Sequence, residues 1–126
     1  VPEDEFRTAI RPLLSHIDSR DADFMVVEAG ASPLEPYNGA AAIDELGANV
    51  RCCILCATDP YAVVGVQQAY GLRPDLVAGP ATNTTAALDL VEKLTGLPGI
   101  NIIDPDAMPE FREFLLGVLG IEAQRS

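Results

Sequence analysis

The sequence DFMVVEAGASPLEPYNG, residues 23–39, decides how the rest of the chain is interpreted. It begins with a short apolar run that ends in a single carboxylate, Glu28. A loop containing two prolines, a serine and an asparagine follows, and helix-forming residues begin at Ala40. This order predicts a buried strand, then a functional loop, then a helix.

The rest of the chain continues the same alternation of short apolar runs and helical patterns. Strands that are apolar on both faces and alternate with helices are typical of a parallel sheet covered on both sides. We therefore expect one α/β domain over residues 1–126, with three α/β/α layers and a mainly parallel sheet of about four strands. The predicted strands are residues 24–27, 50–57, 76 to 78 or 79, and 99–103, and the predicted helices are residues 3–20, 39–46, 61–70, 86–95 and 108–119.

The composition is strongly acidic, with 19 acidic residues against 8 basic ones and a net charge of −11. Nucleic acids and anionic membranes both require clustered Lys and Arg, so neither is an expected partner. No apolar run approaches the roughly 20 residues that a membrane-spanning helix needs. Ten glycines and few helix charges favour a homo-oligomer.

The three cysteines include a CxxC spacing at Cys53 and Cys56. Both fall in the predicted strand 50–57, where residues three apart point to opposite faces, so the pair is not expected to grip one metal ion. Buried thiols that act as small hydrophobic groups are the favoured interpretation. Free thiols favour a cytoplasmic protein.

Several catalytic and nucleotide-binding motifs are missing from this sequence. It contains no GxGxxG, no GxxxxGK[ST] and no GxSxG. Its one histidine, His16, lies in the first predicted helix and is expected at the surface. A Ser-His-Asp triad is therefore not expected.

Polar residues follow the predicted strands, at the edge where open parallel sheets bind ligands. Many such residues cap helices, and capping is the favoured role for Asp59 and Asp106. The run 82–85, TNTT, has more hydrogen-bonding groups than one cap requires. The candidate cofactor contacts are Asp59, Thr82, Asn83 and Thr84.

Glu28 ends a predicted buried strand ten residues before the next helix, so capping does not explain it. A carboxylate in such a place can hold Mg²⁺, and Glu28 is the candidate catalytic and metal-binding residue. The alternative is an ion pair with Arg20 or Arg51. The loop after it is expected to form a substrate wall or a subunit contact, through Gly30, Ser32, Glu35, Tyr37 and Asn38.

The segment VVEAGA, residues 26–31, resembles the VEGAG segment of dethiobiotin-synthetase-like P-loop ATPases, with Ala29 in place of a glycine. The resemblance covers about residues 23–104. It implies that Glu28 helps bind Mg²⁺, that the following glycine lines the substrate site and that Asn83 contacts the base of ATP. The P-loop half of that family is missing from this sequence.

The leading expectation is therefore the C-terminal part of a longer Mg-ATP-dependent enzyme of the P-loop type. Its expected partners are the N-terminal domain of the same parent chain and a small-molecule ligand. Two alternatives stay open: a non-catalytic ligand-binding or regulatory domain, and a module that oligomerises through apolar helices. Whether the chain is an enzyme is left open.

Overall fold

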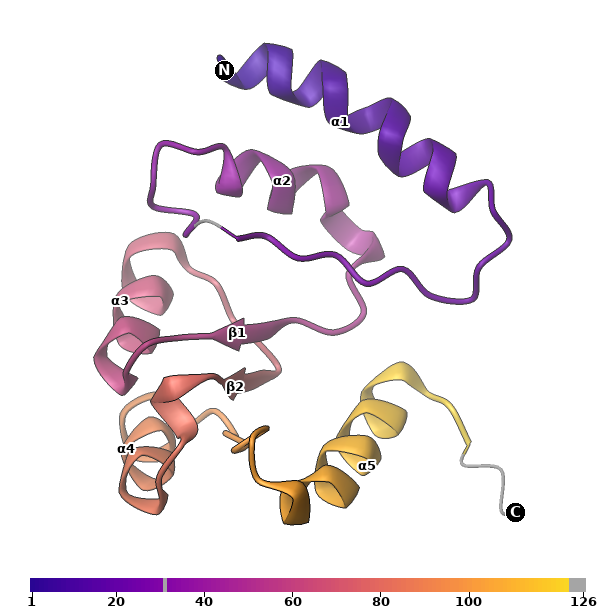
Figure 1. Ribbon diagram of the computed structural model, residues 1–126. Helices are drawn as coiled ribbons and strands as arrows, with labels where there is room; N and C mark the ends of the chain where they lie inside the picture. Colours follow the sequence, from indigo (N-terminus) through magenta and orange to yellow (C-terminus); the bar gives the residue numbers. More distant parts are fainter. Residues whose placement is uncertain (31, 123–126) are drawn as a thin grey trace. The chain divides into compact units, whose positions relative to one another are not determined.

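The computed structural model describes residues 1–30 and 32–122 (Figure 1). These residues contain five α-helices and a two-stranded parallel sheet, so the fold is mixed α/β and mainly helical. The α/β class and the parallel pairing are confirmed. The chain divides into two compact units, Val1–Asn49 and Val50–Ser126, which are described separately. Two compact units can belong to one domain, so the single-domain interpretation stays a prediction.

The unit Val1–Asn49 contains helix α1, Glu3–Asp18, helix α2, Gly39–Leu46, and a short 3₁₀ turn, Gly47–Asn49. Both α-helices lie where the sequence predicts them. Three acidic residues in the first turn of α1 suit the positive end of the helix dipole. Gly47 ends α2 with a φ of 50°, a region that glycine tolerates best.

Ion pairs join α1 to α2, and α1 has no fully buried residue. The Arg11 guanidinium binds both carboxylate oxygens of Glu45, each at 2.8 Å. Arg7 donates to the same carboxylate at 3.0 Å, and it also reaches Glu3 at 2.7 Å and Asp44 at 3.1 Å. The Glu45 side chain is only 11% exposed, so this cluster is partly shielded from water.

The Glu45 cluster predicts an acid-sensitive helix pair. Hydrogen bonds from Arg11 and Arg7 lower the pKa of Glu45 from 4.5 to about 2. A pKa lowered in the folded state gives stability that is present above about pH 4.5 and is lost as the pH falls towards 2. We expect Glu45→Gln to weaken α1–α2 pairing at neutral pH. The pairing in this variant should also depend less on pH between about 4.5 and 2, as measured by amide exchange of α1. The control is Glu5→Gln, which removes an exposed acidic side chain from α1. If the loss of α1 protection with falling pH were the same in Glu45→Gln as in the wild type, this prediction would be contradicted.

Residues 24–27 do not form the expected strand. The segment runs extended in Figure 1 but carries no strand assignment. A strand is defined by backbone hydrogen bonds to a neighbour, and the described part of Val1–Asn49 contains no other strand. The apolar pattern is therefore present without the pairing that would make it a strand.

In the unit Val50–Ser126, strand β1, Ile54–Cys56, pairs in parallel with β2, Leu76–Ala78. The register places Leu55 beside Val77. The predicted strand 50–57 is thus shortened, and 76–78 is confirmed. The predicted strand 99–103 is reduced to one parallel bridge, Val77 to Gly99, because the chain turns after Ile100 and the Asp104 amide bonds back to the Asn101 carbonyl.

Three helices complete this unit: α3, Pro60–Tyr70; α4, Thr85–Thr95; and α5, Met108–Leu119. Short 3₁₀ turns, Pro80–Thr82 and Pro105–Ala107, precede α4 and α5. Each of these three α-helices ends at a glycine with positive φ: Gly71, Gly96 and Gly120.

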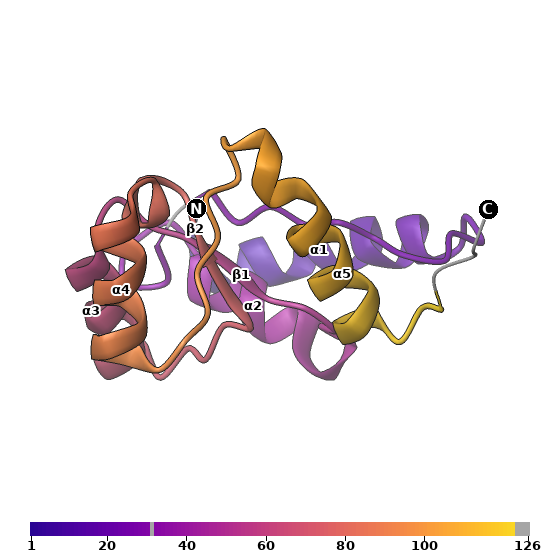
Figure 2. The same cartoon turned by 90° about the horizontal axis from the view of Figure 1, so that it is seen from below.

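Helices α3 and α4 lie side by side and cover one face of the sheet (Figure 2). The buried cluster consists of small and β-branched residues: Ala57, Val63, Val77, Ala81 and Val91. All of β2 is buried, whereas in β1 only Leu55 packs against this cluster. The described residues include no helix long and apolar enough to cross a membrane.

The prediction that all three thiols are buried is wrong for Cys56, which is exposed. The alternation of β1 turns Leu55 towards the core and therefore turns Cys56 away from it. Cys52 and Cys53 are half-buried, and desolvation, with help from the nearby Asp75 carboxylate, raises the pKa of both thiols. A raised pKa keeps these thiols protonated and unreactive at neutral pH.

Candidate functional site

The carboxyl ends of β1 and β2 open onto loops that are tied together by backbone hydrogen bonds. The Ala81 amide in the second loop donates to the Ala57 carbonyl in the first at 3.0 Å. Gly79 allows this approach, because its φ is 83° and an added Cβ would lie 3.0 Å from that same carbonyl oxygen. The structure thus brings the neighbourhoods of Asp59 and Asn83 to one edge, as predicted from the strand order.

Asp59 caps helix α3. One carboxylate oxygen accepts from the Tyr61 and Ala62 amides at 2.9 and 3.0 Å, and the other accepts from the Thr58 hydroxyl at 3.0 Å. Led by the Ala62 amide and the Thr58 hydroxyl, these donors hold the pKa of Asp59 below its usual range. Both oxygens are engaged in the cap, which was the favoured interpretation, and a ligand contact of Asp59 stays a prediction.

Thr82 is completely buried and joins two loops. Its hydroxyl lies 2.7 Å from the Ile100 carbonyl oxygen and 3.0 Å from the Gly79 carbonyl oxygen. A hydroxyl has one proton and donates it to one acceptor at a time, so the shorter contact, to the Ile100 carbonyl, is the stronger hydrogen bond. Thr82 therefore stabilises the loop after β2 by bonding it to the segment at Ile100. Its predicted cofactor contact is not tested by this arrangement.

Asn83 differs from the other three candidate residues in how its side chain is bonded. Its side-chain oxygen is buried and has no hydrogen-bond partner among residues 1–30 and 32–122. Its backbone carbonyl accepts from the Asn101 side-chain amide at 3.4 Å. The next residue, Thr84, caps α4 by accepting from the Ala87 amide at 3.2 Å. Of the four candidate cofactor contacts, Asn83 is the one with a buried polar atom left to satisfy.

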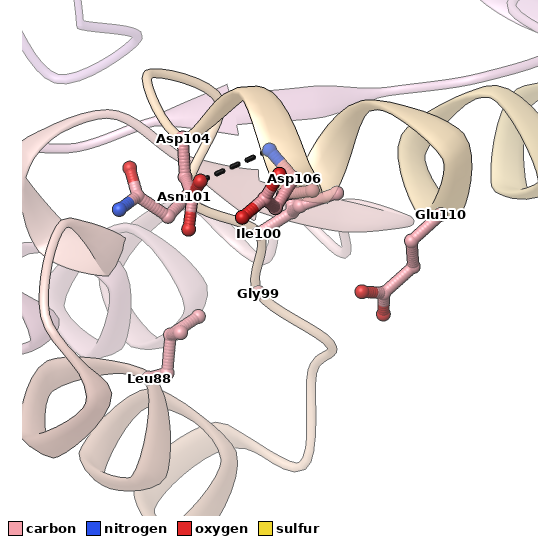
Figure 3. A pocket seen from close by; sticks show the side chains of 8 residues that line it. Leu88, Gly99, Ile100, Asn101, Asp104, Asp106 and Glu110 are labelled. Atoms are coloured by element: carbon pink, nitrogen blue, oxygen red, sulfur yellow. Dashed lines mark hydrogen bonds between the residues drawn. The ribbon is translucent and has the colours of Figure 1, made fainter.

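A hollow of about 280 Å³ lies beside this edge, between the start of α4, the Gly99 bridge and the start of α5 (Figure 3). Its polar lining is rich in acceptors. Asp104 accepts from the Asp106 amide at 3.0 Å and so orders the turn before α5. The capping role favoured for Asp106 is wrong, because the N-cap of α5 is Ala107 and no side chain caps that helix. The lining residues are Leu88, Gly99, Ile100, Asn101, Asp104, Asp106, Ala107 and Glu110.

Sequence reasoning missed Asn101 and Glu110 as lining residues. Asn101 falls inside a predicted strand, so no signal placed it in a loop. Glu110 lies in the first turn of α5, where an acidic residue is common and does not by itself indicate a site. The acidic pair Asp104 and Asp106 was recognisable, because both follow the fourth apolar run.

Glu28 and the predicted substrate loop belong to the unit Val1–Asn49. Glu28 is exposed. Arg20, one alternative partner, contacts His16 at 3.1 Å instead. No group of three His, Cys, Asp or Glu residues suited to a metal ion occurs in the described part of the chain. Glu28 would therefore have to act as a single carboxylate ligand.

The loop that follows is organised by its own hydrogen bonds. The Ser32 amide donates to the Glu35 carboxylate at 2.8 Å, and the Leu34 amide donates to the Ser32 hydroxyl at 3.2 Å. Glu35 is thereby engaged within the turn. Tyr37 is exposed, and Gly30 has open space around its Cα, so no close approach requires a glycine there.

Asn38 stands at the start of α2, but its side chain does not cap the helix. Its φ of 62° places it in the left-handed region, where asparagine is tolerated. The side-chain amide donates instead to the Val1 carbonyl at 3.1 Å. Asn38 thus anchors the start of the chain to the loop.

We expect Thr82→Val to destabilise Val50–Ser126 by about 1–3 kcal/mol, because a nearly isosteric side chain would leave the buried Ile100 carbonyl without its donor. The free energy of unfolding in urea measures this loss. Thr85→Val is the matched control, since Thr85 is exposed at the start of α4. Equal stability of the two variants would show that the Thr82 hydroxyl does not hold the edge.

Comparison with known protein families, curated proteins and solved structures found no match to this chain.

Proposed function

We propose that this chain is the C-terminal portion of a Mg-ATP-dependent enzyme of the P-loop type, and that Val50–Ser126 supplies contacts to the nucleotide base. The observation that supports this most directly is the buried side-chain oxygen of Asn83, which has no partner in the described residues. Buried polar atoms almost always have a hydrogen-bond partner. The exocyclic amine of adenine is a donor of the kind that this oxygen lacks.

The neighbouring hollow supports the same assignment. Asn101 lines it and also bonds to the Asn83 backbone, so the hollow and the unsatisfied amide are linked by one side chain. Its carboxylates, on Asp104, Asp106 and Glu110, suit the N–H groups of a base and repel phosphate. The base would enter this edge, and the phosphates would lie away from it.

Glu28 is the proposed ligand for Mg²⁺. This ion keeps several waters and uses one or two carboxylates together with substrate phosphates, so one exposed carboxylate is a sufficient contribution. The chain has little positive charge to offer phosphates. In this proposal the N-terminal domain of the parent chain supplies the P-loop, and the second substrate meets Gly30, Ser32, Glu35, Tyr37 and Asn38.

The finer architecture is part of the same proposal. We expect the assembled protein to have three α/β/α layers and about four parallel strands. Two of these strands would be residues 24–27, which are unpaired in this chain, and residues 99–103, which form a single bridge. The exposed side chains of Ile54 and Cys56 on β1 support a further layer on that face. The proposed protein is cytoplasmic and homo-oligomeric.

A non-catalytic domain that binds a small ligand at the same edge is the second candidate. The acidic lining of the hollow favours it, because a ligand without phosphates would avoid repulsion from Asp104, Asp106 and Glu110. Nucleoside and nucleotide binding separate the two candidates. Adenosine that binds as tightly as ATP favours the second.

We expect Asn83→Ala to weaken ATP binding about tenfold, because the variant lacks the acceptor for the base. Asn83→Asp keeps an acceptor oxygen and should retain most of the affinity. Titration calorimetry with Mg-ATP on the full parent protein measures both. Asn49→Ala, at an exposed asparagine of the other unit, is the control. Wild-type affinity in Asn83→Ala would remove Asn83 from the base site.

Glu28→Gln tests the metal role separately. The amide lacks the negative charge that Mg²⁺ prefers, so ATP turnover by the parent protein should fall by about a hundredfold or more while base binding persists. Raising the Mg²⁺ concentration should restore part of the turnover. Full turnover in Glu28→Gln would exclude Glu28 from the mechanism, and absence of both turnover and nucleotide binding in the wild type would favour the second candidate.

A further inference from the structure

Residues 24–27 form an exposed apolar segment in the unit Val1–Asn49. The chain runs extended here (Figure 1), and the side chain of Val26 is 96% exposed. The exposed fractions of Phe24, Met25 and Val27 are 50%, 41% and 44%. Four consecutive large apolar side chains are left uncovered in this way.

The backbone of the same segment is also free to pair. None of its amides or carbonyls takes part in a hydrogen bond between described residues. Aromatic and β-branched residues favour strands, and an unpaired extended apolar segment is a template for another strand. The segment therefore has both the side chains and the backbone groups that strand addition requires.

Carboxylates bracket this segment and argue against a second copy of the chain as its partner. Asp21 and Asp23 precede it, and Glu28 follows it directly. In-register parallel pairing of two copies would place Asp23 beside Asp23 and Glu28 beside Glu28. Antiparallel pairing centred on the segment would place Asp23 opposite Glu28. Like charges oppose each other in both arrangements, which destabilises the pair.

We propose that residues 24–27 bind a β-strand of another polypeptide whose apolar core is flanked by lysine or arginine. The basic flanks would lie opposite Asp23 and Glu28, and the apolar core would cover the exposed side chains. An extended strand has two edges, so this inference leaves the other edge for the sheet of the chain itself. It does not depend on nucleotide binding.

The probe is a fluorescein-labelled synthetic peptide with Val-Ile-Val-Ile between two pairs of lysines, tested on the full chain. A second peptide carries glutamates in place of the lysines. We expect the basic peptide to bind at least about tenfold more tightly by fluorescence anisotropy, to slow amide exchange at residues 24–27, and to lose affinity with added salt.

Val26→Pro removes a backbone donor, and Val26→Glu adds a like charge to the segment, so each should weaken peptide binding about tenfold. Leu34→Ser is the control, because Leu34 is an exposed apolar residue of the same unit that lies outside the segment. Circular dichroism checks that α1 and α2 persist. Absent binding, equal affinity for both peptides, or binding unchanged in both Val26 variants would overturn the proposal. Protection of the same amides in a dimer without peptide would overturn it in favour of a second copy.

Discussion

The hydrogen bond between the Thr82 hydroxyl and the Ile100 carbonyl, 2.7 Å long and completely buried, holds the edge on which the candidate contacts of Val50–Ser126 depend. It joins the loop after β2 to the segment that follows the Gly99 bridge. Gly99 makes the approach possible, since an added Cβ would lie 2.9 Å from both Thr82 Cγ2 and Leu88 Cδ2. A larger residue would force apart the loop that carries Asn83 and the turn that carries Asn101.

This edge shows how helix capping and ligand binding compete for the same kinds of residue. Asp59 and Thr84 each satisfy amides of the helix that they begin, and Asp104 satisfies a turn. The capping oxygens of Asp59 and Thr84 are therefore already used, and Asp104 uses one of its two carboxylate oxygens. Asn83 belongs to no such arrangement, although it is surrounded by residues that do. Its unsatisfied oxygen is informative because buried polar atoms almost always have a partner, and the hydroxyls of Thr82 and Thr84 on either side of it both have one.

The helices of this protein could be predicted well because their signals are local. Asp59 followed by Pro60 starts α3, Gly71 ends it, and Gly96 ends α4, all within a few residues of the pattern that predicts them. Strands depend on partners elsewhere in the chain, so apolar runs alone overstate them. Residues 24–27 have the composition of a strand and lack its neighbour, while 99–103 turns after one bridge.

In the candidate site, too, some features follow from local sequence signals and others depend on contacts between distant residues. Loops at the carboxyl ends of β1 and β2 could be placed together from strand order, and this gathering is found. Sequence could not separate Asn83 from Thr82, because the difference lies in what each side chain meets: one hydroxyl is enclosed by two carbonyls, and one amide oxygen meets none. Asn101 was hidden inside a strand pattern. Such distinctions require the tertiary contacts themselves.

The distribution of apolar residues gives the remaining argument about how this chain works. Hydrophobic residues make up 48% of the sequence, yet the buried ones in the described part are mostly alanine and valine, and α1 buries none. In Val1–Asn49 the ion pairs of Arg7 and Arg11 with Glu45 join α1 to α2. Ion pairs near a surface stabilise weakly, whereas covering Phe24 and Val26 would remove a large apolar area from water. The unit Val1–Asn49, in which ion pairs join two helices while a strand-forming segment stays exposed, is best explained as one that is completed by pairing with another strand.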